Sequence, residues 1–134
     1  MQYLIFSVNN ELFALRLAHI DRVIRVVKIA AAPLMSKALL GMINLLGVPL
    51  PVLSARALID ASPKEIELSD QLICMTFEGK KFALLVDRVE EIKEISQKAV
   101  VSAESLALKN PRFAQVIQEK DRFIFEFTLN AEVF

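Results

Sequence analysis

Residues 78–89 read Glu-Gly-Lys-Lys-Phe-Ala-Leu-Leu-Val-Asp-Arg-Val, and they repeat a stretch near the start of the chain. The pieces match in the same order: Asn9-Asn10 with Glu78-Gly79, Phe13-Ala14-Leu15 with Phe82-Ala83-Leu84, and Asp21-Arg22-Val23 with Asp87-Arg88-Val89. A single three-residue match is often accidental, but two such matches and a matching turn in one order indicate an internal duplication. The sequence therefore predicts two similar structural units.

The segments around these repeats have the pattern of β-strands. Each one alternates apolar and polar residues or forms a short apolar run, and turn residues separate the segments. Asn9-Asn10 suits a two-residue hairpin turn because asparagine tolerates a positive φ. The expected strands are 3–8, 12–17, 22–27, 39–46 and 48–54 in the first half, and 72–77, 81–86, 88–95, 113–118 and 123–129 in the second. We therefore expect an all-β fold of two five-stranded units.

The connections between these strands are expected to be short, with few helical residues. Five short strands in a flat sheet would leave exposed edges, so each unit should close into a small barrel. Residues 60–70, which are polar and contain Ser62-Pro63, are the expected connector between the units. Ala18–Ile20 suits a helical turn, Pro33 closes a loop, and Ser102–Asn110 suits a helix that Pro111 ends.

The composition argues against most catalytic and metal chemistry. The 134 residues suit one domain or two small lobes. Three glycines are too few for a dinucleotide fingerprint or a phosphate-binding loop. A single cysteine, Cys74, and a single histidine, His19, exclude an internal disulfide and argue against a zinc site. Because no nucleophile, base and orienting group converge, we expect no enzymatic activity and no cofactor.

The charge balance argues against a nucleic-acid-binding protein. Sixteen basic and sixteen acidic residues give a net charge of zero, whereas domains that bind nucleic acid usually carry a basic surplus. Residues 1–58 are nevertheless basic on balance and residues 59–134 acidic. The basic group Arg16, Arg22, Arg25 and Lys28 lacks the interleaved aromatic residues that stack on bases. A small nucleic-acid-binding barrel stays an alternative, and it predicts an affinity that falls steeply with salt.

The sequence predicts a cytoplasmic protein without membrane insertion. Ala38–Ala55 contains no charged residue and is just long enough for a membrane span. Pro49 and Pro51 would break a helix there, so buried strands explain the stretch better. Met1–Phe6 lacks the basic region and long apolar stretch of a secretory signal. The lone thiol fits a reducing compartment.

Individual reactive side chains are expected to have structural roles. His19 has no serine or cysteine spaced to form a triad with it, so a structural or surface position is expected. Cys74 lies in an apolar strand and should be a small core residue, with redox sensing as the alternative. The acidic stretch Glu90–Glu94 alternates with apolar residues. It suits a solvated strand face, or alternatively an acidic rim that steers a basic partner.

Residues 41–53, Gly-Met-Ile-Asn-Leu-Leu-Gly-Val-Pro-Leu-Pro-Val-Leu, resemble the central motif of the CheW-like coupling proteins of bacterial chemotaxis. The family pattern there is Gly, two residues, Asn-Leu-Arg-Gly, three residues and Pro-Val, then an apolar residue and Asp. Residues 84–92, Leu-Leu-Val-Asp-Arg-Val-Glu-Glu-Ile, resemble a second family motif. Further matches are Tyr3–Phe6, Phe13-Ala14, Ile20, Val23 and Pro33. The resemblance covers residues 3–129, which is nearly the whole chain.

This resemblance implies one CheW-like domain over residues 1–134, built from two five-stranded, SH3-like barrels that share a hydrophobic core. Subdomain 1 would span about 10–60 and subdomain 2 about 70–129, and an exchange of terminal strands is left open. The family implies a non-enzymatic adaptor that couples the cytoplasmic tip of a methyl-accepting chemoreceptor to the regulatory domain of a CheA-type histidine kinase through apolar grooves. The residues at matching contact positions are Ile20, Arg22, Val23, Gly41, Leu46, Val89 and Ile92. By strand spacing alone, the apolar members of this set would be core residues.

Four positions depart from the family pattern, and they open an alternative function. Leu46 stands where the family has the arginine of Asn-Leu-Arg-Gly, and Arg22 stands where a glutamate is common. Ser54 replaces an aspartate, and Ser36 replaces a second proline. Exchanging a guanidinium for an apolar side chain changes what an interface can bind. The alternative is therefore a divergent interaction module of a signalling array that no longer engages the kinase.

Overall fold

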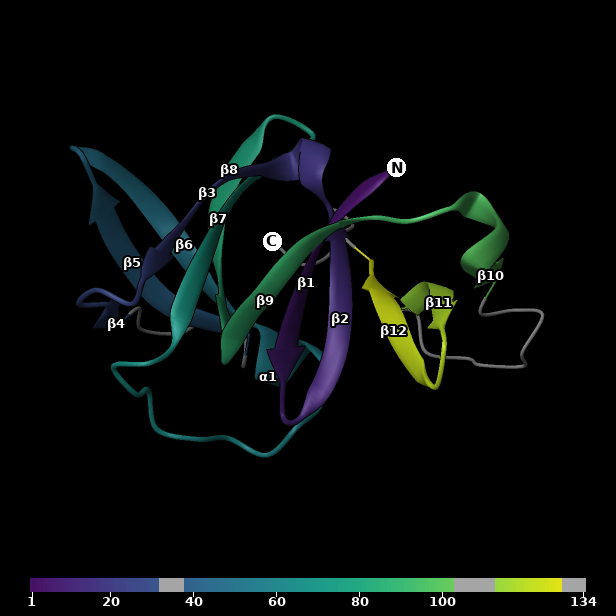
Figure 1. Cartoon of the computed structure of the whole chain (residues 1–134). Coiled ribbons are helices and arrows are strands. Elements are labelled where there is room, and N and C mark those ends of the chain that lie inside the picture. The colour runs from purple at the N-terminus through teal and green to yellow at the C-terminus, as the bar shows by residue number, and fades with distance from the viewer. Residues whose placement is uncertain (32–37, 103–112, 129–134) are drawn as a thin grey trace. The chain divides into compact units, whose positions relative to one another are not determined.

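The computed structural model describes residues 1–31, 38–102 and 113–128 (Figure 1). Pro33, Ser36 and residues 103–110 of the predicted helix lie outside the described residues, and Ser102 ends a strand instead. The strands are β1 Gln2–Val8, β2 Glu11–Arg16, β3 Ile20–Arg25, β4 Ala30–Ala31, β5 Leu39–Leu45, β6 Val48–Ser54, β7 Gln71–Phe77, β8 Lys80–Val86, β9 Arg88–Glu94, β10 Val100–Ser102, β11 Phe113–Glu119 and β12 Arg122–Phe127. The all-β prediction is confirmed.

The strands form two six-stranded sheets in two units of the chain. Unit 1 comprises Met1–Ala18 and Val89–Phe134, and unit 2 comprises His19–Arg88. The strand order is β10-β11-β12-β2-β1-β9 in unit 1 and β3-β7-β8-β6-β5-β4 in unit 2. Each sheet has six strands rather than the expected five, because the very short strands β4 and β10 carry too few residues to show a period of two.

The two sheets have the same strand order once the repeats are aligned. The hairpin β1–β2 corresponds to β7–β8, and β3 to β6 correspond to β9 to β12. Each hairpin pairs with the later strands of the other repeat, and both sheets contain one parallel pair, β2 with β12 and β8 with β6. The repeats have thus exchanged their hairpins between the two units, an exchange of strands that the expectation had left open. The division into subdomains at about 10–60 and 70–129 stays a prediction.

The hairpin turns follow from the residues at their tips. Asn9 and Asn10 both have positive φ values of 55° and 64°, and they join Val8 to Glu11 in β1 and β2. Glu78 and Gly79 have φ values of 50° and 78° and join β7 to β8 in the same way. Positive φ at both central residues matches the right-handed twist of the flanking strands. The predicted correspondence between the two turns is confirmed.

The sheet of unit 2 must curl back on itself. Its two edge strands, β3 and β4, are joined directly by the chain from Arg25 to Ala30, which can span at most about 17 Å. Six strands in a flat sheet would place the edges about 24 Å apart. The short connection therefore brings the edges toward each other, as a small barrel requires.

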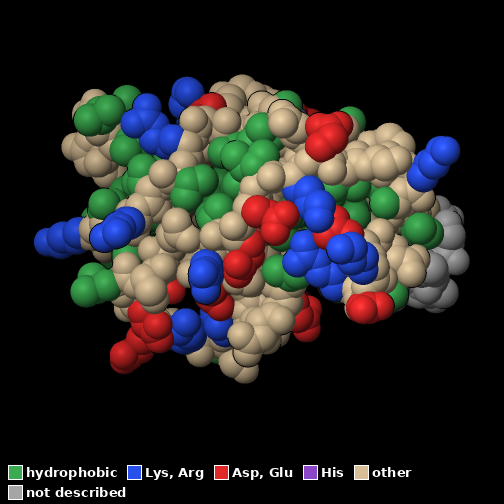
Figure 2. All heavy atoms as spheres, in the orientation of Figure 1, with side chains coloured by type: hydrophobic (Ala, Val, Ile, Leu, Met, Phe, Trp, Pro, Cys, Tyr) green, Lys and Arg blue, Asp and Glu red, His purple; other side chains and the backbone are tan. Residues whose placement is uncertain are grey.

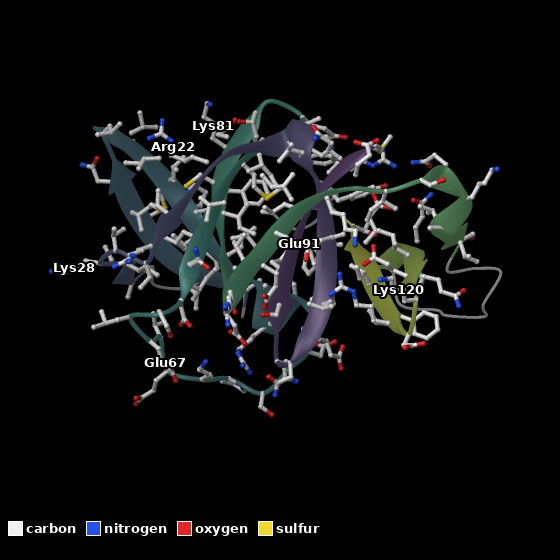
Figure 3. All side chains as sticks on the ribbon, in the orientation of Figure 1. Arg22, Lys28, Glu67, Lys81, Glu91 and Lys120 are labelled. Carbon is white, nitrogen blue, oxygen red and sulfur yellow. The ribbon has the colours of Figure 1, made fainter. Side chains whose placement is uncertain are left out.

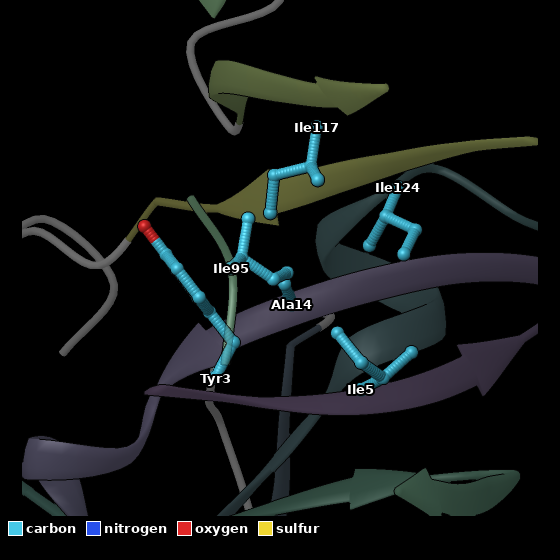
Figure 4. Close-up of a cluster of buried hydrophobic side chains, with 6 residues drawn as sticks. All are labelled: Tyr3, Ile5, Ala14, Ile95, Ile117 and Ile124. Carbon is cyan, nitrogen blue, oxygen red and sulfur yellow. The ribbon is translucent and has the colours of Figure 1, made fainter. Parts of the chain in front are cut away.

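Each unit contains its own cluster of buried apolar side chains. In unit 1 the cluster consists of Tyr3, Ile5, Ala14, Ile95, Ile117 and Ile124 (Figure 4). In unit 2 it consists of Ile43, Leu50, Val52, Leu72, Cys74 and Ala83. Cys74 is thus a core residue, as its apolar strand predicted. A core shared between the units stays a prediction.

Short helical segments follow strands in both units. Leu17–His19 forms a 3-10 turn (η1) where a helical turn was predicted, and Gln97–Ala99 forms a second (η2). Ala55–Leu58 (α1) follows β6, and Ser54 caps it because its hydroxyl accepts a hydrogen bond from the Ala57 amide. No helix in the described part of the chain is both long and apolar enough to cross a membrane, and most of Ala38–Ala55 forms β5 and β6.

Candidate protein-interaction surfaces

Strand β3 carries three of the predicted site residues and forms an edge of the sheet in unit 2. It pairs with β7 on one side, and a register shift between Ile20 and Arg22 interrupts the ladder. Arg22 is exposed, whereas Ile20 and Val23 are half-buried. A bulged edge with charged residues resists pairing with other chains while it still displays side chains to them.

A polar network fixes the start of β3. The Thr76 hydroxyl donates a hydrogen bond of 2.7 Å to Asp21, and the Lys81 ammonium lies 3.8 Å from the same carboxylate. Asp21 is therefore held by β7 and β8, and it leaves the neighbouring Arg22 projecting from the strand. Figure 3 shows Arg22 and Lys81 on the same side of unit 2.

Strand β9 carries the two site residues of the second repeat and forms an edge of the sheet in unit 1. Val89 is half-buried, and Ile92 has 57% of its surface exposed. The position of β9 in its sheet is the same as that of β3 in the other, so the duplication places both predicted contact sets on equivalent edge strands. An exposed isoleucine on an edge strand is available for contact with a partner.

The acidic residues of β9 are paired with groups of the same unit. Ser7 donates a hydrogen bond of 3.0 Å to Glu90, and the Arg122 guanidinium lies 3.9 Å from Glu91. The Lys93 ammonium donates to Glu119, which also accepts from Arg122. The hydrogen bond from Lys93 lowers the pKa of Glu119. Figure 2 shows basic and acidic side chains intermingled here, so the acidic rim is largely compensated.

The turn between β5 and β6 presents the most unusual of the predicted site residues. Leu46 and Gly47 have φ values of 52° and 86°, and the Gly47 amide donates a 2.7 Å hydrogen bond to the Asn44 side chain. A left-handed conformation is costly for leucine, yet 84% of Leu46 is exposed to solvent. Neither packing nor backbone preference accounts for a leucine at this position, and a contact between Leu46 and a partner stays a prediction.

Gly41 has a packing role that the structure makes plain. A Cβ atom at this position would lie 2.0 Å from the carbonyl oxygen of Ala30 in β4. Gly41 is buried, pairs with Ala31 and lies next to a register shift in β5. Only glycine therefore lets β4 lie against β5, and direct contact between Gly41 and a partner stays a prediction.

The outer face of β5 and β6 contains exposed residues that the sequence analysis did not single out. Met42 and Asn44 are exposed and lie opposite Pro51 and Pro49 in the neighbouring strand. Both prolines are tolerated because β6 pairs with β8 only through Val52–Ser54, which leaves residues 49–51 free of that ladder. Residues 49–52 alternate between proline and an apolar side chain, and this period of two could have identified the face that carries Met42, Asn44 and the two prolines.

A partly open cavity of about 580 Å³ lies between the connector and the sheet of unit 2. The Arg56 guanidinium binds Asp87 at 2.9 Å and donates a 3.2 Å hydrogen bond to the Ser62 carbonyl. The cavity lining also includes Leu40 and Leu85, which pack against the core cluster. Because Arg56 contacts both Asp87 and the Ser62 carbonyl, this side of the cavity holds the connector against the sheet.

His19 and Cys74, the two side chains with the greatest chemical reactivity in the sequence, both pack against apolar neighbours. The His19 ring lies edge-on to Phe77, with 5.3 Å between the ring centroids. Cys74 is buried, and burial raises the pKa of its thiol. A buried thiol with a raised pKa is a poor nucleophile and a poor redox sensor.

The structure distributes the seven predicted site residues over both units. Val89 and Ile92 lie in unit 1, and the other five lie in unit 2: Ile20, Arg22, Val23, Gly41 and Leu46. Leu46 and Ile92 are well exposed, and Gly41 is buried. Ser54, which replaces a family aspartate, keeps a helix-capping oxygen, so this departure preserves the local structure.

Comparisons with known proteins agree with this duplicated all-β architecture. The sequence profile of the CheW-like domain matches residues 2–131, and the chain therefore belongs to the CheW-like domain family, a family of chemotaxis scaffold and adaptor proteins. The crystal structure of the scaffolding protein TtCheW from Thermoanaerobacter tengcongensis is similar, with a TM-score of 0.88 and 22% sequence identity. The similarity covers 96% of this chain and 89% of that one. No curated protein sequence matches the chain.

Proposed function

We propose that this chain is a non-enzymatic, cytoplasmic adaptor that couples the cytoplasmic tip of a chemoreceptor to the regulatory domain of a CheA-type histidine kinase. Membership of the CheW-like family supports the adaptor role. The observation that carries the proposal is the placement of the predicted contact residues on β3 and β9, which occupy equivalent edge positions in the two sheets. Two equivalent edges suit a protein that must hold two partners at once.

The contact residues divide into two sets with different chemistry. On β3, Ile20 and Val23 supply apolar surface beside the exposed cation of Arg22. On β9, Val89 and Ile92 supply apolar surface among charges that are already paired within the unit. The charged residues of β9 already have partners within the unit, so they gain little from a new partner. Apolar contact by Val89 and Ile92 should therefore dominate the binding free energy of the β9 set.

Calorimetric titration with the purified kinase regulatory domain, and separately with the receptor tip, tests the proposal. Ile92→Asp should weaken binding to one of the two partners at least about tenfold, because it places a charge in an apolar contact. Phe123→Asp is the matched control, since Phe123 is 55% exposed in the same unit but lies on β12. If neither partner binds the unmodified chain, the coupling role is wrong while the fold assignment stands.

A second candidate function is an interaction module that has lost kinase coupling. Leu46 favours it, because an exposed leucine replaces the guanidinium of the family motif at the tip of the β5–β6 hairpin. Under this alternative, Leu46→Arg should create kinase binding that the unmodified chain lacks. Kinase binding that is already present and is weakened by Leu46→Arg would instead support the coupling role with an apolar contact at this turn.

A further inference from the structure

The end of β3 and the end of the connector meet at one side of unit 2. The Val26 amide donates a 3.1 Å hydrogen bond to the carbonyl oxygen of Asp70, one residue beyond the last strand pair, Arg25 with Gln71. This bond brings Val27 and Lys28 next to the turn that runs from Glu67 to Asp70. Figure 3 shows Lys28 and Glu67 on the same side of the unit.

The centre of this surface is apolar and unusually exposed. Leu68 is 92% exposed, and Val27 and Ile66 are each 46% exposed. The Val26–Asp70 hydrogen bond brings Val27 close to the turn that carries Leu68, while Ile66, two residues before Leu68, also lines the cavity under the connector. Exposed apolar side chains on one stretch of surface indicate a contact surface. We call Val27, Ile66 and Leu68, with the charged residues Arg25, Lys28, Glu65 and Glu67, the connector patch.

The rim of the connector patch is basic on one side and acidic on the other. Arg25 and Lys28 are exposed, and neither forms an ion pair with another of the described residues. Glu65 and Glu67 flank Ile66 on the other side, and Lys64 lies 3.6 Å from Glu67. Figure 2 shows hydrophobic side chains between basic and acidic ones at this edge of the molecule's face.

Hydrogen bonds within unit 2 hold both ends of the connector. The Glu67 amide donates a 2.9 Å hydrogen bond to the buried Asp70 carboxylate, and the Asp70 amide donates a 3.0 Å bond back to the Glu67 carbonyl. At the other end, Arg56 holds the Ser62 carbonyl. Leu68 is therefore displayed on an ordered turn, which reduces the entropic cost of binding.

We propose that the connector patch binds the same patch of a second copy of this chain. A twofold rotation about the apolar centre places Arg25 and Lys28 of one copy against Glu65 and Glu67 of the other, twice over. A patch with one basic and one acidic side is thus complementary to itself, and Leu68 of each copy packs against Val27 of its neighbour. This patch is smaller than a standard interface, so the dimer should be weak and salt-sensitive.

Sedimentation velocity tests the proposal on the full chain without kinase or receptor, so its result is independent of the coupling role. The unmodified chain should shift from monomer to dimer between about 0.01 and 1 mM at low salt and less so at high salt. Leu68→Asp should abolish the shift. Val48→Asp is the control, because Val48 is also an exposed apolar residue of unit 2, with 49% of its surface exposed, but it lies outside the patch.

Charge reversal provides the sharper test. The double variant Arg25→Glu with Lys28→Glu reverses the charge of the basic side, and the double variant Glu65→Lys with Glu67→Lys reverses that of the acidic side, where Lys64 also lies. Each should be monomeric alone, and the two should form a mixed dimer when combined, which also shows that both are folded. A chain that stays monomeric to about 1 mM, or mixed variants that do not associate, would overturn the proposal.

Discussion

The carbonyl oxygen of Ala30 lies 2.0 Å from the point that a Cβ atom on Gly41 would occupy. Gly41→Ala should therefore push β4 away from β5 and lower the free energy of unfolding by about 1–3 kcal/mol. Urea denaturation measures the loss, and hydrogen exchange should accelerate at the amides of Ala30 and Ala31. Gly79→Ala is the control, because Gly79 also has a positive φ but no neighbouring atom within 4 Å. Equal effects of both substitutions would show that backbone conformation, and not the close approach, determines the cost.

Leu46→Asn should stabilise the chain by about 0.5–1 kcal/mol, because asparagine tolerates the left-handed conformation that leucine holds at a φ of 52°. The same substitution should weaken any partner that contacts the hairpin tip. Urea denaturation gives the change in stability, and calorimetry gives the change in binding. A loss of stability would mean that Leu46 makes a packing contact that its exposure does not suggest.

The ion pair between Arg56 and Asp87 should hold the connector closed. Both side chains are largely shielded from solvent, and the 2.9 Å contact links α1 to the end of β8. Arg56→Ala should raise the rate of proteolysis within residues 60–70 and lower the free energy of unfolding by about 1–3 kcal/mol. A double-mutant cycle with Asp87→Ala measures the coupling between the two residues. Additive effects would mean that Arg56 acts through the Ser62 carbonyl alone.

Glu119 should make the stability of the chain depend on acid pH. Its pKa is lowered from the ordinary value of 4.5, chiefly by the hydrogen bond from Lys93. A lowered folded-state pKa stabilises the fold above the unfolded value, and this contribution disappears as pH falls through the folded value. Between pH 7 and 3 the unmodified chain should lose more stability than Glu119→Gln.

Lys93→Met provides a second measurement, because it removes the hydrogen bond that chiefly lowers the pKa of Glu119. It should reduce the loss of stability at acid pH in the same direction as Glu119→Gln. If neither variant changes the slope of stability against pH, the contacts of Glu119 with Lys93 and Arg122 contribute nothing measurable in solution.

Local residue chemistry accounts for the parts of the fold that were predicted correctly. Asn9-Asn10 and Glu78-Gly79 specify two-residue turns through their tolerance of positive φ, and the alternating residues on both sides of each turn specify the strands. Cys74 was expected in the core because its neighbours in the strand are apolar, and it is buried there. These properties depend on residues close together in the sequence.

Other properties could not be predicted because they depend on residues far apart in the sequence. The exchange of hairpins between the repeats follows from pairing partners such as Val52 with Ala83, which local patterns do not specify. The packing role of Gly41 depends on the approach of Ala30, and the exposure of Leu68 depends on how the connector is tied to Asp70. Apolar residues such as Ile92 and Ile95 look alike in sequence, yet only Ile92 is exposed.

By itself, the sequence determined that this protein is a duplicated all-β chain with the motifs of a chemotaxis adaptor, because turn preferences and strand periodicity are local and survive in any arrangement of the sheets. Only the tertiary structure decided which strands share a sheet and which apolar side chains reach solvent. Burial is a property of what packs against a residue, and in both buried clusters of this chain the neighbours come from the two repeats together.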